Sequence, residues 1–127
     1  MGALLLMKPI IIDWGWRFDV IQCPDFIADN INDYQMQFDQ WLGDKNNDHG
    51  YWVSYPPVEP GFPDPYHPRD PDGKDAVSWG VVEFMEWLNE FIEFNDSDEK
   101  VTLIEFQLYD RVRIQKMVDT GITRIYG

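Results

Sequence analysis

The chain has 127 residues, the size of one domain, and its 23 acidic and 10 basic residues give a net charge of −13. This charge argues against a conventional nucleic-acid-binding protein, because the phosphate backbone would be repelled. Aromatic residues make up 16% of the chain, which argues against an acidic disordered protein, and the single cysteine excludes an internal disulfide.

The first predicted elements are two strands that form a hairpin. Residues 9–14 are apolar and β-branched through three consecutive isoleucines, and residues 16–22 continue as the second strand. Gly15 between them predicts the turn, because glycine adopts the backbone conformations that tight turns require.

A helix is predicted over residues 24–42, since Pro24 suits a first helical position and Gly43 a helix end. Apolar residues recur there every three or four positions and form one stripe: Ile27, Ile31, Tyr34, Phe38, Trp41 and Leu42. Another side carries three aspartates at four-residue spacing: Asp25, Asp29 and Asp33. The predicted helix is therefore amphipathic, with an acidic outer side.

A short aromatic strand at 51–55 is followed by a proline-rich loop at 56–73. Seven of the nine prolines lie between residues 56 and 71, in two runs with the three-residue spacing of polyproline II. Interleaved Phe62 and Tyr66 favour a stiff strap that packs on its own domain. The alternative is a ligand for a polyproline-binding domain.

The second predicted helix covers residues 76–94, and the stretch 76–99 has seven acidic residues and no basic one. Its apolar stripe consists of Val77, Val81, Phe84, Leu88 and Phe91, widened by Met85 and Ile92. Four glutamates share the opposite side: Glu83, Glu86, Glu90 and Glu93. On an ideal helix Trp79 falls inside this acidic stripe and Trp87 along its edge, which predicts aromatic anchors among steering charges.

The C-terminal part is predicted to contain a strand at 101–109 and a closing pair of strands at 112–118 and 122–126, although 111–118 is also compatible with a short helix. The predicted fold is α+β in a single domain, 1–127. It has a mainly antiparallel sheet that includes the strand at 51–55, two amphipathic helices on one face and a long proline-rich loop.

No motif for catalysis, a metal or a cofactor is present, so we expect a protein that is not an enzyme. The segment Asp44–Asp48 has oxygens at the first positions of a calcium loop, but His49 stands where glycine is needed. Cys23 and the two histidines lack the spacing of a metal site.

The apolar run within Met1–Met7 is too short for a signal peptide or a membrane span, which predicts a cytoplasmic protein without membrane contact.

The acidic helix sides, with Trp79 and Trp87 as anchors, resemble the immunity proteins of bacterial toxin–immunity pairs, including those of contact-dependent growth inhibition. The resemblance is one of overall character, and no family motif carries it. It implies that the chain binds and neutralises a basic toxin, such as a nuclease, and that it makes no direct contact with nucleic acid. Charge steering would speed the capture of such a partner.

Two other functions fit the composition. An acidic mimic of nucleic acid could inhibit a DNA-binding protein, and it would need charges spaced along an extended surface. A carbohydrate-binding or hydrolytic module could use Trp14, Trp16 and Trp52 as stacking platforms.

Overall fold

The computed structural model describes residues 6–54, 73–94 and 99–127. The chain divides into two compact units, the first formed by residues 1–35 and 80–127 and the second by residues 36–79. Nearly all of the proline-rich loop lies outside the described residues, so the strap over 56–73 stays a prediction.

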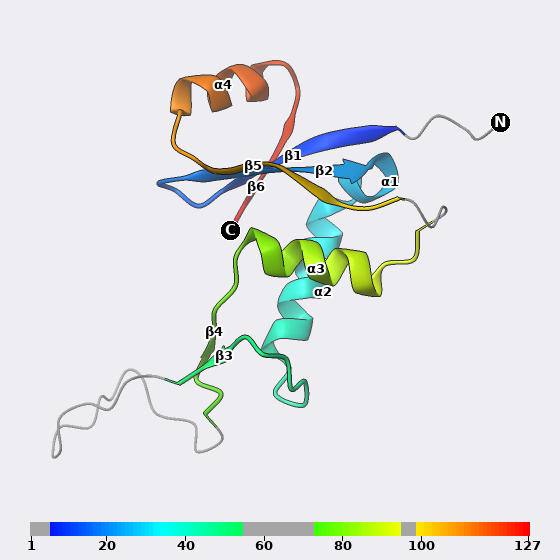
Figure 1. Cartoon of the computed structure of the whole chain (residues 1–127), viewed down its shortest axis with the longest axis vertical. Helices are drawn as coiled ribbons and strands as arrows, with labels where there is room; N and C mark the ends of the chain where they lie inside the picture. Colours follow the sequence, from blue (N-terminus) through cyan, green and yellow to red (C-terminus); the bar gives the residue numbers. More distant parts are fainter. Residues whose placement is uncertain (1–5, 55–72, 95–98) are drawn as a thin grey trace, which may run out of the picture. The chain divides into compact units, whose positions relative to one another are not determined.

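The first unit is built on a four-stranded sheet with the order β5-β2-β1-β6 (Figure 1). Its strands are β1 (Met7–Asp13), β2 (Phe18–Pro24), β5 (Thr102–Leu108) and β6 (Thr123–Tyr126). The pairs β1–β2 and β2–β5 are antiparallel, whereas β1–β6 is parallel. The predicted α+β class with a mainly antiparallel sheet is therefore confirmed.

The predicted hairpin is formed by β1 and β2. Gly15 has φ +92°, a conformation that side chains with a Cβ rarely adopt, and its N–H donates to Oδ1 of Asp13 at 2.7 Å. The backbone N–H of Trp14 also donates to the carbonyl of Arg17 at 3.0 Å. Local turn chemistry therefore fixes the register of this hairpin.

Both faces of the sheet are buried, because a helix beyond the two predicted helices covers the second face. Ile10, Ile11 and Ile12 are each at most 1% exposed although they alternate between the two faces. Ile11 and Val20 pack with Ile114 of α4 (Arg111–Asp119), which lies on the side of the sheet opposite α3 (Figure 1). The additional helix α4 explains the second covered face.

The segment 111–118 is helical, so the predicted closing pair of strands is wrong and its helical alternative is confirmed. The carboxylate of Asp110 accepts a hydrogen bond from the backbone N–H of Arg113 at 3.0 Å and caps the start of α4. Gly121, with φ +95°, follows the end of the helix. Because β5 and β6 run parallel, α4 is the crossover between them.

The predicted helix 24–42 is two helices, α1 (Asp25–Ala28) and α2 (Ile31–Gly43). Asn30 separates them: its side-chain amide donates to the carbonyl of Phe26, and its own carbonyl accepts from Tyr34 at the start of α2. An asparagine side chain that bonds a nearby backbone carbonyl competes with the backbone hydrogen bonds of a continuous helix. The apolar stripe itself is confirmed, with Ile27, Ile31, Phe38 and Leu42 buried.

The second unit contains the C-terminal part of α2 and a two-stranded ribbon of β3 (Trp52–Val53) and β4 (Ala76–Val77). The prediction that 51–55 joins the main sheet is wrong. The ribbon consists of two residues of β3 that pair with two residues of β4. The residues of β4 belong to the segment that was predicted to start the second helix.

Asp19 is buried at 0% exposure near the start of β2. Its Oδ2 accepts the indole N–H of Trp14 at 2.7 Å, and its Oδ1 accepts the backbone N–H of Gln107 at 2.7 Å. Gln107 has φ 55°, and β5 carries register shifts opposite this part of β2. One buried carboxylate therefore joins the hairpin tip to the irregular part of β5.

Cys23 provides a test of this burial. Desolvation raises the pKa of its thiol to about 12, and the side chain is 0% exposed on β2. Because the thiolate is the reactive form, we expect no reaction with Ellman's reagent at about pH 8 in the native chain and full reaction after unfolding in guanidinium. Rapid labelling of the native chain would contradict this placement.

Candidate functional site

The second predicted helix begins later than expected, and this changes the candidate site. The helix α3 covers Val81–Phe91, and residues 76–77 belong to β4 instead. Trp79 therefore lies before the helix and outside the glutamate stripe, which corrects its predicted position. Its ring is half-buried and meets the ring of Phe38 edge-to-face at 5.1 Å within the second unit.

Gly80 and Glu83 form the start of α3. The side chain of Glu83 turns back, and its Oε2 accepts the backbone N–H of Gly80 at 2.8 Å. A carboxylate in this place satisfies one of the free N–H groups at a helix start and interacts favourably with the helix dipole. Glu83 thus has a structural role that its place in the stripe did not reveal.

The exposed acidic side chains at α3 are Glu86, Glu90 and Glu93. Glu86 and Glu90 lie one turn apart on the helix, and Glu93 follows its C-terminal end. We call these three residues the acidic face of α3.

The aromatic residues of α3 are placed differently from the prediction. Trp87 is only 6% exposed and belongs to the core, so it cannot serve as an exposed anchor. Phe91, predicted in the core, is 52% exposed because it is the last residue of the helix. Phe91 is thus the exposed aromatic side chain of this helix, next in sequence to Glu90.

The aspartate side of the first predicted helix does not form one continuous face. Asp25 and Asp33 lie on different helices, and Asp29 lies in the turn between them. The ammonium group of Lys8 donates to Asp29 at 2.6 Å, and this hydrogen bond, despite slight desolvation, raises the pKa of Lys8. The ion pair offsets part of the negative charge here, which leaves α3 as the stronger candidate surface.

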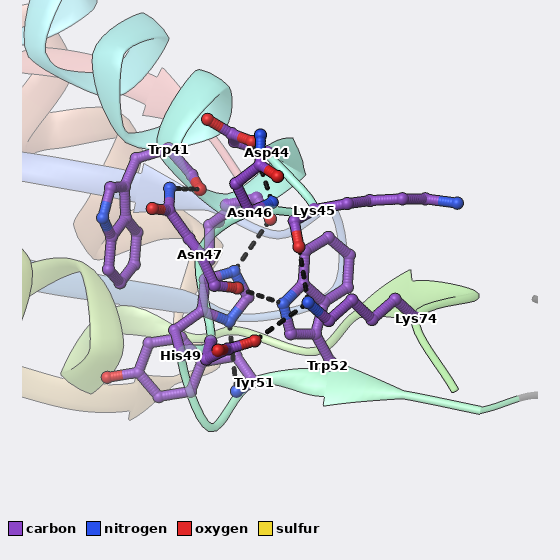
Figure 2. A network of polar contacts seen from close by, with 11 residues as sticks. Trp41, Asp44, Lys45, Asn46, Asn47, His49, Tyr51, Trp52 and Lys74 are labelled. Atoms are coloured by element: carbon purple, nitrogen blue, oxygen red, sulfur yellow. Dashed lines mark hydrogen bonds and ion pairs between the residues drawn. The ribbon is translucent and has the colours of Figure 1, made fainter. Parts of the chain in front are cut away.

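The second unit contains a cluster of aromatic and polar side chains around His49 (Figure 2). The His49 ring stacks on Trp52 with centroids 4.7 Å apart and lies 4.8 Å from the ring of Trp41. One ring nitrogen, Nε2, is 2.8 Å from the carbonyl of Leu42, and the other accepts the N–H of Tyr51 at 3.3 Å. Both nitrogens are engaged, so His49 is structural and not a metal ligand in this arrangement.

Asp44 (Figure 2) and Asp48 of the calcium-like segment are also engaged in local structure. Oδ1 of Asp44 accepts the N–H of Asn46 at 3.0 Å, as in an Asx turn, and Asp48 pairs with Lys74 at 3.0 Å. Within residues 6–54, 73–94 and 99–127, no group of three His, Cys, Asp or Glu side chains is placed to hold a metal ion. The same residues contain no helix long and apolar enough to cross a membrane.

The three tryptophans considered as stacking platforms belong to different settings. The indole N–H of Trp14 donates a hydrogen bond to the carboxylate of Asp19. Trp16 is 62% exposed, and the guanidinium of Arg17 lies 4.8 Å from the centroid of its ring. Trp52 belongs to the second unit, where its indole N–H donates to the carbonyl of Asn47 at 2.7 Å. Neither unit brings all three together as one platform.

The sequence was compared with protein-family models, curated proteins and solved structures, and nothing in any of the three comparisons matches it.

Proposed function

We propose that this chain binds a basic protein through the acidic face of α3, as immunity proteins bind their toxins. The observation that carries the proposal is the exposed group Glu86, Glu90 and Glu93 in a stretch, 76–99, that contains no basic residue. Charges of one sign at an exposed helix steer a partner of opposite charge and accelerate its association.

A protein partner is favoured over nucleic-acid mimicry by the extent of the charged surface. Mimicry needs charges along an extended surface, whereas the aspartates of α1 and α2 are interrupted by a turn and partly offset by Lys8. The compact acidic face of α3, with the half-exposed ring of Phe91 at its end, suits a localised contact on a folded partner. A basic toxin, such as a nuclease with a cationic active site, is the partner class that we propose.

Affinity capture with mass spectrometry identifies the partner, and a charge-reversal pair then tests the surface. We expect Glu86→Lys with Glu90→Lys to reduce the association rate constant about tenfold or more and to weaken its dependence on salt. Stopped-flow association at several ionic strengths measures both effects.

The matched control is Asp29→Lys with Asp33→Lys, which changes the net charge by the same amount in the first unit. We expect this control to change association much less. Equal effects of the two double variants would show that the total charge, and not α3, guides the partner. A larger effect of the control would place the interface on the aspartate side.

A further inference from the structure

An open cavity of about 460 Å³ lies in the first unit, lined by residues of α4, β6 and the β1–β2 hairpin. Its volume is typical of sites for small organic ligands. Its lining combines apolar and charged groups: Phe18, Ile114, Arg111, Lys116, Arg124 and Asp13.

The charge of this cavity is opposite to that of the chain. Three of the ten basic residues line it, against the single carboxylate of Asp13, although the whole chain carries −13. Within the described parts of the chain, the three basic side chains make no ion pair, whereas Arg113 on the same helix pairs with Glu105 at 2.6 Å. The cavity therefore gathers cationic groups that the single carboxylate of its lining neutralises only in part.

Both arginines of this lining contact an aromatic ring, and one of them is also held by a hydrogen bond. The guanidinium of Arg111 donates to the carbonyl of Gly15 in the hairpin turn and lies 5.6 Å from the centroid of the Phe18 ring. The guanidinium of Arg124 lies 5.4 Å from the centroid of the Tyr126 ring. Arg111 therefore loses little freedom on binding, and the planar donors of both guanidinium groups match the oxygens of phosphate and carboxylate.

We propose that this cavity binds a phosphate monoester with a small apolar body. Three cations and the Asp13 carboxylate give the lining a formal charge near +2, and a phosphate monoester carries about −1.5 to −2 at neutral pH. Phe18 and Ile114 provide the apolar part of the wall for the body of the ligand. The inference concerns a different surface from the acidic face of α3 and does not depend on the proposed protein partner.

Calorimetric titration of the full chain with phenyl phosphate tests this proposal. We expect saturable binding with one site, at least about tenfold tighter than benzoate, which has one charge, and inorganic phosphate, which lacks the apolar body. Phenol has the body without the charge and should not bind measurably. Failure of phenyl phosphate to saturate, or equal binding of phenol, would overturn the proposal.

Variants on the exposed residues Arg124 and Lys116 locate the binding. We expect Arg124→Gln and Lys116→Gln each to weaken phenyl phosphate about tenfold, because each removes a charge from the lining. Arg113→Gln is the matched control: it removes the same charge from α4, but Arg113 does not line the cavity. Circular dichroism verifies folding, and an equal loss of binding in Arg113→Gln would overturn the assignment to this cavity.

Discussion

Phe84→Ala is expected to lower the free energy of unfolding by about 3–5 kcal/mol, which is a large part of the stability of a small domain. Phe84 is 0% exposed and lies on α3 together with the buried residues Val81 and Leu88. Truncation removes the apolar contacts of a whole ring and leaves a cavity that a packed core fills only in part. Urea denaturation monitored by circular dichroism measures the loss.

Phe91→Ala is the matched control for this prediction, because it removes the same ring from the same helix. Phe91 is 52% exposed, so we expect it to cost less than about 1 kcal/mol of stability. If the proposed partner covers this end of α3, Phe91→Ala would instead weaken binding by increasing the dissociation rate. Similar stability losses for Phe84 and Phe91 would mean that the two rings are equally buried.

The sequence predicts those parts of the fold that depend on local patterns. The hairpin follows from the isoleucine run and Gly15, and the apolar stripe of α2 follows from its periodicity. The sequence does not predict where α3 begins. Residues 76 and 77 continue the apolar pattern of the helix, yet they form β4 and pair with Trp52 and Val53. Pairing between distant segments outweighed the periodic signal there.

The predicted candidate site is less accurate than the predicted fold, and the reasons lie in particular residues. Trp79 shares the helical phase of the glutamates, but Gly80 precedes the first turn and leaves Trp79 outside the helix. Trp87 falls at the edge of the acidic stripe on an ideal wheel, while its large ring turns inward and is buried. Periodicity gives the direction of a Cα–Cβ bond and does not reveal how far a long side chain reaches into the core.

The basic cavity was missed because its residues are brought together only by the tertiary fold. Arg111 and Lys116 lie on α4, Arg124 on β6, and Phe18 on β2. The sequence shows one relevant signal, a surplus of five basic over three acidic residues in 100–127. That surplus becomes a site only once the crossover through α4 places β6 beside β1.

We expect Asp19→Ala to lower the free energy of unfolding by about 2–4 kcal/mol, because it removes the acceptor of two hydrogen bonds at a buried position. The indole N–H of Trp14 and the backbone N–H of Gln107 both lose the carboxylate. The backbone donor is the more costly of the two, since β5 turns irregularly at Gln107 to reach Asp19. Asp19→Asn keeps one acceptor oxygen but directs an amide NH₂ toward a donor, so it should recover only part of the loss.

Two measurements separate this effect from a general loss of packing. Hydrogen exchange by NMR should show the Gln107 amide exchanging at least about tenfold faster in Asp19→Ala, beyond the change caused by lower global stability. Trp14→Phe removes the indole donor and keeps an aromatic ring, so a double-mutant cycle with Asp19→Ala measures the coupling between the two side chains, which we expect to be about 1 kcal/mol or more. Unchanged protection of Gln107 in Asp19→Ala would mean that the carboxylate does not hold this part of β5.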